Sequence, residues 1–225
     1  MRKSYHIESF ILIFINVAFA IMVSQHDWAS HTLVEWGAMS KGIEPTVQTL
    51  HDFPPFNLLS ESGLLTHEIS GYPLLILRSI YASFLQFSWI HLFNNVLVLG
   101  VIGKLFEDTN YPGLLTFVYL LTGSVSMISA YYLNPNAITA GASGAIFGIL
   151  GVCLILGYKA KWLYRHDKMD ISISNAYARV GDYVYGLLVY NIVVTFMMPN
   201  VSIVGHIAGL LCGMIIGLLL PTRKY

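Results

Sequence analysis

A serine and a histidine are the residues of this chain whose types and surroundings point to covalent chemistry. Ser143 lies in the sequence Gly141-Ala142-Ser143-Gly144 at the start of a long apolar run, and His206 opens a later apolar run. Polar and ionisable groups that persist within membrane-length apolar runs usually carry function. Because a serine hydroxyl becomes an effective nucleophile when a neighbouring base takes its proton, the pair predicts a nucleophile, Ser143, and its base, His206.

Each residue on its own has a simpler interpretation. Ser143 could be a small packing residue between glycines, and His206 could cap a helix or relay protons. A small channel or transporter that uses His91 and His206 as a proton or ligand path is a further alternative. It would predict internal repeats and discontinuous spans, and we find neither in the sequence.

The composition indicates a membrane protein. Of the 225 residues, 56% are hydrophobic and 11% are charged, whereas a soluble domain carries about 25% charged residues. The formal net charge is zero, which gives no reason to expect a nucleic-acid partner. Cys153 and Cys212 lie in apolar runs without metal-ligand spacing, so we expect no disulfide, no metal and no cofactor. The predicted fold is an all-α membrane protein with a single domain over residues 1–225.

Six apolar runs approach the length of about 20 residues that a helix needs to cross a bilayer. They cover about 8–24, 88–106, 112–132, 143–159, 181–198 and 203–220. The first run resembles a signal peptide because Arg2 and Lys3 precede it, but its apolar residues continue past Ala18-Phe19-Ala20. This continuation favours an uncleaved first span.

Basic residues predict the orientation of these spans. With the N-terminus placed in the cytoplasm, only Lys41 and Arg78 of the 12 Lys and Arg residues fall outside. Because positive residues concentrate in cytoplasmic loops, both termini are predicted to be cytoplasmic. The basic loops and the lack of a transit peptide favour a bacterial inner membrane.

The segment 25–87 between the first two spans is too polar to cross the membrane and too apolar for a free linker. Leucine pairs alternate in it with prolines, serines and a glycine. Long loops without a span of their own are usually functional or disordered. We interpret this segment as short helices that lie in the outer interface and belong to the fold.

The predicted topology brings the polar residues to one depth. Spans two, four and six run in the same direction, so His91, Ser143 and His206 all lie near the outer ends of their spans. His206 also lies on a face with glycine at every fourth position: Gly205, Gly209, Gly213 and Gly217. Small residues allow membrane helices to approach closely, and Gly144 and Gly148 supply small positions on span four. The imidazole is therefore expected to reach the hydroxyl.

The neighbours of this pair define the expected mechanism. No Asp or Glu lies in the outer half of any predicted span, so we predict a Ser–His dyad rather than a triad. A developing oxyanion needs donors aimed at it, and the Ser143 amide at a helix N-terminus, with the side chains of His91 and Asn95, can supply them. Phe147, one turn beyond Ser143, is expected to pack against the imidazole.

The motifs in this order resemble the rhomboid intramembrane serine proteases. The resemblance is carried by Gly141-Ala142-Ser143-Gly144, by His206 followed by Gly209 and Gly213, and by His91 with Asn95. Trp36-Gly37-Ala38, Arg78 and Glu107 extend it over nearly the whole chain. It implies a six-helix bundle with the serine helix at its centre and a long first loop partly embedded in the outer leaflet.

The resemblance also implies roles for the site residues. Ser143 would be the nucleophile and His206 the general base, with His91, Asn95 and the Ser143 amide as the oxyanion hole and Phe147 stacked on His206. The supporting glycines would be Gly141, Gly144, Gly209 and Gly213. The substrates would be transmembrane segments of other proteins, cleaved near the outer leaflet after passing beside span five under a cap at about 197–204. The sequence leaves the oligomeric state open.

The chain departs from the family pattern in three supporting positions. Gln86 stands where many bacterial relatives have histidine, Phe147 where they often have tyrosine, and Leu77 where they often have tryptophan. An inactive relative that acts as a membrane chaperone or trafficking factor is the alternative function. Such members lack the serine or the histidine, and this chain has both.

Overall fold

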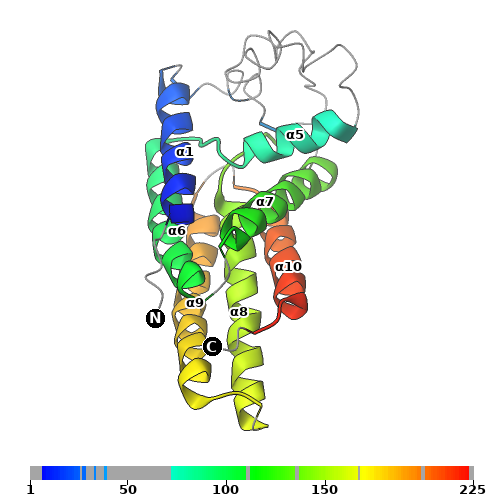
Figure 1. The fold of residues 1–225 in the computed structure, drawn as a ribbon. Helices are drawn as coiled ribbons and strands as arrows, with labels where there is room; N and C mark the ends of the chain where they lie inside the picture. The colour runs from blue at the N-terminus through cyan, green and yellow to red at the C-terminus, as the bar shows by residue number, and fades with distance from the viewer. Residues whose placement is uncertain are drawn as a thin grey trace.

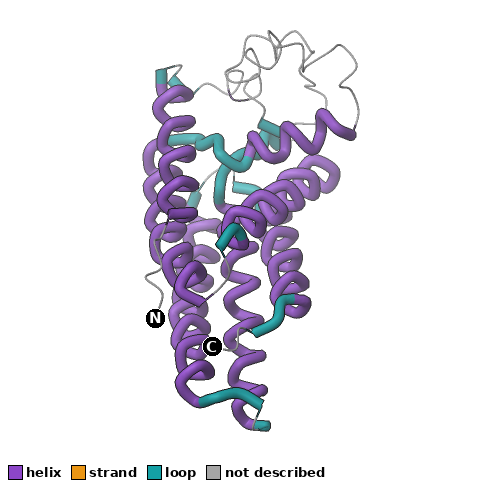
Figure 2. Tube along the Cα trace, in the orientation of Figure 1, coloured by secondary structure: helices purple, strands orange, loops and turns teal. Residues whose placement is uncertain are grey.

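The computed structural model describes residues 7–25, 27–28, 33, 38–39, 72–109, 112–134, 137–166, 168–198 and 201–222. Within these residues the chain forms seven helices and no strand, with loops mainly at the two ends of the bundle (Figure 2). The helices are α1 (Ile7–Ser24), α5 (Tyr72–Ala82), α6 (Trp89–Thr109), α7 (Leu114–Leu133), α8 (Ser143–Arg165), α9 (Ile171–Met197) and α10 (Ile203–Leu219). The all-α prediction is confirmed.

Six of these helices correspond to the six predicted spans. Helices α1, α6, α7, α8 and α9 are each long and apolar enough to cross a membrane, while α10 is apolar but has only 17 residues. Two helices extend well beyond the apolar runs. The fourth run was expected to end near 159, but α8 continues to Arg165, and the fifth was expected to begin near 181, but α9 begins at Ile171. Hydropathy detects only the apolar part of a helix, and polar turns continue both helices beyond it.

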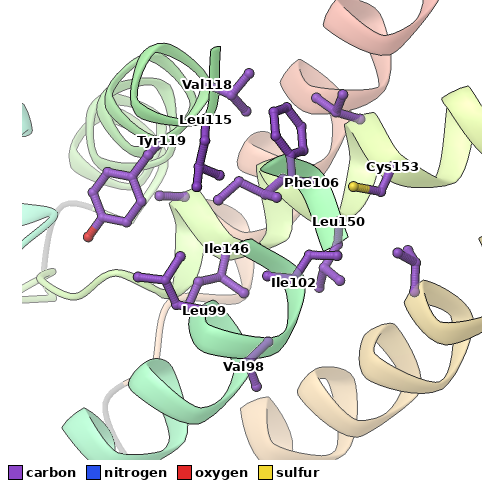
Figure 3. Close-up of a cluster of buried hydrophobic side chains, with 14 of the residues drawn as sticks. Val98, Leu99, Ile102, Phe106, Leu115, Val118, Tyr119, Ile146, Leu150 and Cys153 are labelled. Carbon is purple, nitrogen blue, oxygen red and sulfur yellow. The ribbon is translucent and has the colours of Figure 1, made fainter. Parts of the chain in front are cut away.

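Helix α8 occupies the centre of the bundle (Figure 1). Helices α9 and α10 lie on either side of it, and α7 crosses it at an incline. The core forms where α6, α7 and α8 meet, with Ile102, Phe106, Leu115 and Ile146 fully buried (Figure 3). The central position that the family resemblance implied for the serine helix is therefore present.

Helices α6, α8 and α10 begin at the same end of the bundle, the end near α5 (Figure 1). His91 is the third residue of α6, Ser143 the first of α8 and His206 the fourth of α10. The parallel direction of these helices brings the starts of all three helices together, as the span count predicted. That this end of the bundle faces away from the cytoplasm stays a prediction from the distribution of basic residues.

Only part of the segment 25–87 falls within the described residues. Helix α5 lies across one end of the bundle and packs on α7 (Figure 1), which agrees with a short helix that belongs to the fold. The buried side chain of Arg78 donates from Nη2 to the Ala38 carbonyl oxygen at 2.9 Å. Trp36, Gly37 and residues 40–71 lie outside the described residues, so the other predicted interfacial helices stay a prediction.

Two carboxylates fasten the opposite end of the bundle. Glu107 of α6 accepts hydrogen bonds from the Glu8 amide at 2.8 Å and from the Ser9 hydroxyl at 2.6 Å, at the start of α1. Glu8 in turn accepts from the amides of Gly113 and Thr116 at the start of α7. Because helix N-termini leave N–H groups unsatisfied and favour negative charge, these contacts fix α1, α6 and α7 to one another.

Candidate active site

Ser143 and His206 are in hydrogen-bond contact across the α8–α10 interface. The distance between His206 Nε2 and Ser143 Oγ is 2.7 Å, within the range expected for a nucleophile and its base. His206 is buried, with 7% of its surface exposed, whereas Ser143 is half-buried. Ser202 caps α10 by accepting from the Gly205 amide at 3.1 Å, and this cap sets where the helix that carries His206 begins.

Glycines allow α10 to approach α8 closely enough for this contact. A Cβ atom added to Gly209 would collide with the carbonyl oxygen of Gly144, and one added to Gly213 would collide with that of Gly148. Gly144 also faces α7, where a Cβ would collide with the Ser126 side chain. The glycines at every fourth position of α10 predicted a close approach, and in the structure the backbone of α10 contacts the backbone of α8 at these glycines.

Gly141 has a different task in the loop before α8. Its φ of +122° lies in a region that L side chains rarely adopt. A Cβ at this position would lie 2.6 Å from Cε1 of His91. Its amide donates to the Ala82 carbonyl at 2.8 Å, so the loop is held against both α5 and the His91 ring. Only glycine allows this loop to pass His91 into the start of α8.

Phe147 lies flat against the imidazole of His206. The ring centroids are 4.4 Å apart and the planes meet at 20°. Phe147 is one helical turn beyond Ser143, so the same face of α8 carries the hydroxyl and the ring that supports its partner.

Thr195 of α9 contacts the second ring nitrogen of His206, and sequence reasoning missed it. Its Oγ1 lies 2.9 Å from His206 Nδ1, and 8% of Thr195 is exposed. A search limited to Asp and Glu partners for the histidine could not find a neutral hydroxyl. The available signal was a polar pair one turn apart in an apolar span, Asn191 and Thr195.

His91 faces the same small cavity as the Ser–His pair. The cavity has a volume of about 10 Å³, close to the minimum that holds one water molecule. Its lining includes Ser143, His206, His91, Ser126, Thr139 and Ser202. His91 Nδ1 accepts from the Phe87 amide at 3.3 Å. Because a neutral imidazole that accepts at Nδ1 carries its proton on Nε2, His91 presents an N–H donor from its other nitrogen.

Asn95 lies one turn along α6 from His91, but it is not among the residues that line this cavity. Its Nδ2 donates to Gln86 Oε1 at 2.8 Å, and Gln86 Nε2 donates to Asn16 Oδ1 at 2.8 Å. Asn16 in turn contacts the Tyr119 hydroxyl at 3.0 Å. This chain of buried amides orients Asn95 and leaves its second N–H for another acceptor. Gln86, singled out as a departure from the family pattern, therefore joins Asn95 to α1.

The Ser143 amide is the third predicted donor. Ser143 begins α8, and the N-cap residue Ala142 makes no side-chain hydrogen bond to this helix end. The first amides of a helix have no intrahelical partner, and the helix dipole favours negative charge there. The structure thus brings Ser143, His206, Phe147 and His91 together, whereas Asn95 lies one helical turn from His91 and is bonded to Gln86.

The chain is similar to known proteins over most of its length. The Rhomboid domain family model matches residues 75–223. Rhomboid-like protease 1 of Toxoplasma gondii is 31% identical over 170 residues, which cover 72% of this chain and 55% of the relative. Rhomboid-like protein 11, chloroplastic, of Arabidopsis thaliana is 27% identical over 61% of this chain and 50% of its own length. Rhomboid protease GluP of Bacillus subtilis (strain 168) is 28% identical over 55% of this chain and 22% of the relative. The chain thus spans about half or less of the length of these relatives.

Proposed function

The chain belongs to the rhomboid family of multi-pass membrane proteins, and on this basis we propose that it is an intramembrane serine endopeptidase. The observation that carries the proposal is the 2.7 Å contact between His206 Nε2 and Ser143 Oγ at the starts of two closely packed helices. We assign Ser143 as the nucleophile and His206 as the general base. The proposal concerns the Ser143–His206 site described above, since the chain spans about half or less of the length of its relatives.

The first chemical step follows from this geometry. Ser143 Oγ attacks the carbonyl carbon of a peptide bond while its proton passes to His206 Nε2. The carbonyl oxygen becomes an oxyanion, and we assign the Ser143 amide, the Nε2–H of His91 and the Asn95 side chain as the donors that stabilise it. Collapse of this intermediate breaks the C–N bond, and His206 returns the proton to the leaving amine. An acyl-enzyme on Ser143 remains.

The second step repeats the first with water as the nucleophile. His206 removes a proton from a water molecule, the resulting hydroxide attacks the acyl carbonyl, and the Ser143 oxygen leaves and recovers its proton from His206. The small cavity beside Ser143 and His91, which has both polar and apolar lining residues, supports this step because it offers a place for one water next to the acyl group.

The substrates that we propose are transmembrane segments of other membrane proteins. A helix buries its carbonyl groups in backbone hydrogen bonds, so the segment must unwind locally before a peptide bond reaches Ser143. With both termini in the cytoplasm, as the basic residues predict, cleavage occurs near the outer leaflet. A bacterial inner membrane is the proposed location.

A fluorophosphonate probe tests the proposal, because it phosphonylates only a serine that a base has activated. Purified wild type in detergent should be labelled, while Ser143→Ala should not be labelled and His206→Ala should be labelled at least 10³-fold more slowly. Ser174→Ala removes another buried serine, whose hydroxyl donates to the Ala160 carbonyl far from the site, and should be labelled like wild type. A folded wild type that stays unlabelled would favour an inactive chaperone or trafficking factor instead.

A further inference from the structure

The His206 imidazole has a hydroxyl partner on each of its two nitrogens. Ser143 Oγ lies 2.7 Å from Nε2, and Thr195 Oγ1 lies 2.9 Å from Nδ1. The two hydroxyls come from different helices, α8 and α9, on either side of the ring. Which nitrogen carries the proton of the neutral imidazole therefore depends on which hydroxyl donates and which accepts.

The hydrogen bonds of Thr195 decide this question. Its Oγ1 also lies 2.7 Å from the Asn191 carbonyl oxygen, one turn back on α9. A carbonyl oxygen can only accept, and a threonine hydroxyl has one proton. Two oxygens 2.7 Å apart without a proton between them would repel each other, so the Thr195 proton is directed to Asn191. Thr195 Oγ1 must then accept from Nδ1–H of His206.

This arrangement leaves His206 Nε2 without a proton. Nε2 then has a free lone pair directed at Ser143 Oγ, which is the state that a general base needs. In the other neutral tautomer Nε2 would carry the proton and could not accept one from Ser143. In serine hydrolases with a triad, a carboxylate on Nδ1 enforces the productive tautomer.

We propose that Thr195 is the positioning residue that sets the tautomer and the ring orientation of His206, a task that a carboxylate has in a triad. This inference rests on the proposed function for the role of Ser143. It replaces the plain dyad expected from the sequence with a dyad supported by a neutral hydroxyl. A neutral group suits a site with apolar surroundings, because burying an unpaired or weakly solvated carboxylate is costly.

The position of Thr195 on α9 adds a structural consequence. Ser143, Phe147 and His206 lie on α8 and α10, which contact each other through their backbones. Thr195 contacts the ring of His206 from α9. The orientation of the base therefore depends on where α9 lies relative to the α8–α10 pair.

Substitution with valine and serine tests the role of the Thr195 hydroxyl. Thr195→Val keeps the shape and removes the hydroxyl, and we expect kcat for a transmembrane substrate to fall by about 10-fold, the effect of one neutral hydrogen bond. KM should change less than about two-fold, since Thr195 holds the base and not the substrate. Thr195→Ser restores a hydroxyl and should recover most of the rate. Ser79→Ala removes another buried hydroxyl, which donates to the Ile76 carbonyl at 2.6 Å on α5, and should keep the wild-type rate.

Nitrogen NMR of ¹⁵N-histidine-labelled protein gives a readout that a purely structural role would not change. The neutral His206 of wild type, assigned by comparison with His206→Gln, should have its proton on Nδ1. In Thr195→Val the signal should move towards the Nε2–H tautomer. A wild-type proton on Nε2, or a valine variant with wild-type tautomer and rate, would overturn the inference. Because the NMR measurement needs no turnover, it stays informative even if wild type fails to react with the probe, an outcome that would count against the proposed function instead.

Discussion

Helices α9 and α10 both lie against α8, and they pack on it in different ways. Glycines of α10 contact the backbone of α8 so closely that Gly209 and Gly213 leave no room for a methyl group. Helix α9 is much more open: 17% of its most apolar 18-residue window is buried, against 72% for α8. Its contacts with α8 lie in its first half, where Gly181 packs against Gly157, Ser174 donates to the Ala160 carbonyl, and Tyr177, Val180 and Val184 are buried in the core.

This difference divides the site between a tightly packed and a loosely packed part. Ser143 and His206, the proposed nucleophile and base, lie on α8 and α10, where backbone contacts determine their separation. Thr195, the proposed positioning residue, lies in the second half of α9, where Asn191 and Thr195 are the buried residues within 185–197. Protein regions with few buried contacts open at the lowest free-energy cost. The Ser143–His206 distance therefore depends on the tight α8–α10 interface, and the Thr195–His206 contact depends on the more exposed half of α9.

The strongest test of this comparison places a methyl group in each interface. Gly213→Ala would force a Cβ against the Gly148 carbonyl, which cannot yield as a flexible side chain would, and we expect a loss of about 2–3 kcal/mol in the free energy of unfolding. Probe labelling should fall by more than 10-fold, because α10 must move away from Ser143. Thermal and denaturant unfolding in detergent micelles measure the first effect, and labelling kinetics measure the second.

Gly181→Ala is the matched control on α9. Its Cβ would lie 3.5 Å from the Gly157 Cα, which is ordinary van der Waals contact. The higher helix propensity of alanine offsets any small clash, so both stability and labelling should stay near wild type. Equal losses in the two variants would show that α9 and α10 pack on α8 with similar tightness, contrary to the comparison.

The stacking of Phe147 on His206 gives the next largest effect. Phe147→Leu removes a ring contact of 4.4 Å between centroids without introducing polarity. Such pairs contribute about 0.5–1.5 kcal/mol beyond burial, which corresponds to a fall of roughly 2-fold to 10-fold in kcat. Phe147→Tyr keeps the ring and should retain most activity. If Phe147→Leu were as active as wild type, Thr195 and the backbone packing would suffice to hold the base.

A smaller effect is expected at the contact between α9 and α6. The Tyr190 hydroxyl donates to Asn94 Oδ1 at 2.6 Å in an exposed position. Tyr190→Phe removes the bond, and we expect about a two-fold change in turnover of a transmembrane substrate, with unchanged labelling by a small probe. Tyr183→Phe on the same helix, where the side chain is also exposed, should change neither. A large change in labelling would mean that the Tyr190–Asn94 bond is needed to hold Thr195 of α9 in place against His206.

The smallest effect concerns the first turn of α9. The Ser172 side chain and amide donate to the carboxylate of the N-cap residue Asp170 and lower the pKa of Asp170 below its ordinary value. A lowered pKa stabilises the folded turn above the unfolded value of about 3.9, and the contribution is lost as the pH falls through the folded pKa. Amide exchange at Ser172, measured by mass spectrometry and corrected for intrinsic rates, should therefore accelerate on acidification. Asp170→Asn keeps the cap without a titrating group and should abolish this pH dependence.

Several features of the fold and site were predictable because they depend on local patterns. Apolar runs predicted the membrane helices, since a helix in lipid must be apolar over about 20 residues. The C-terminal limit of α8 and the N-terminal limit of α9 were not predictable, because polar turns continue both helices without a hydropathy signal. The side chains of Ser143, His206 and Phe147 meet as their spacing along α8 and the glycine series on α10 indicated.

The sequence by itself determined which residues are candidates for the chemistry and that they stand at the starts of three helices, because residue type and helical spacing are local properties. Only the tertiary structure decided what surrounds the reactive pair. Thr195 reaches His206, and Gln86 reaches Asn95 and Asn16, across contacts between segments far apart in the chain. The sequence pattern around a single hydroxyl or amide does not indicate which distant residue will be its hydrogen-bond partner. Such partners depend on how closely helices pack, and in this molecule that closeness differs between α9 and α10.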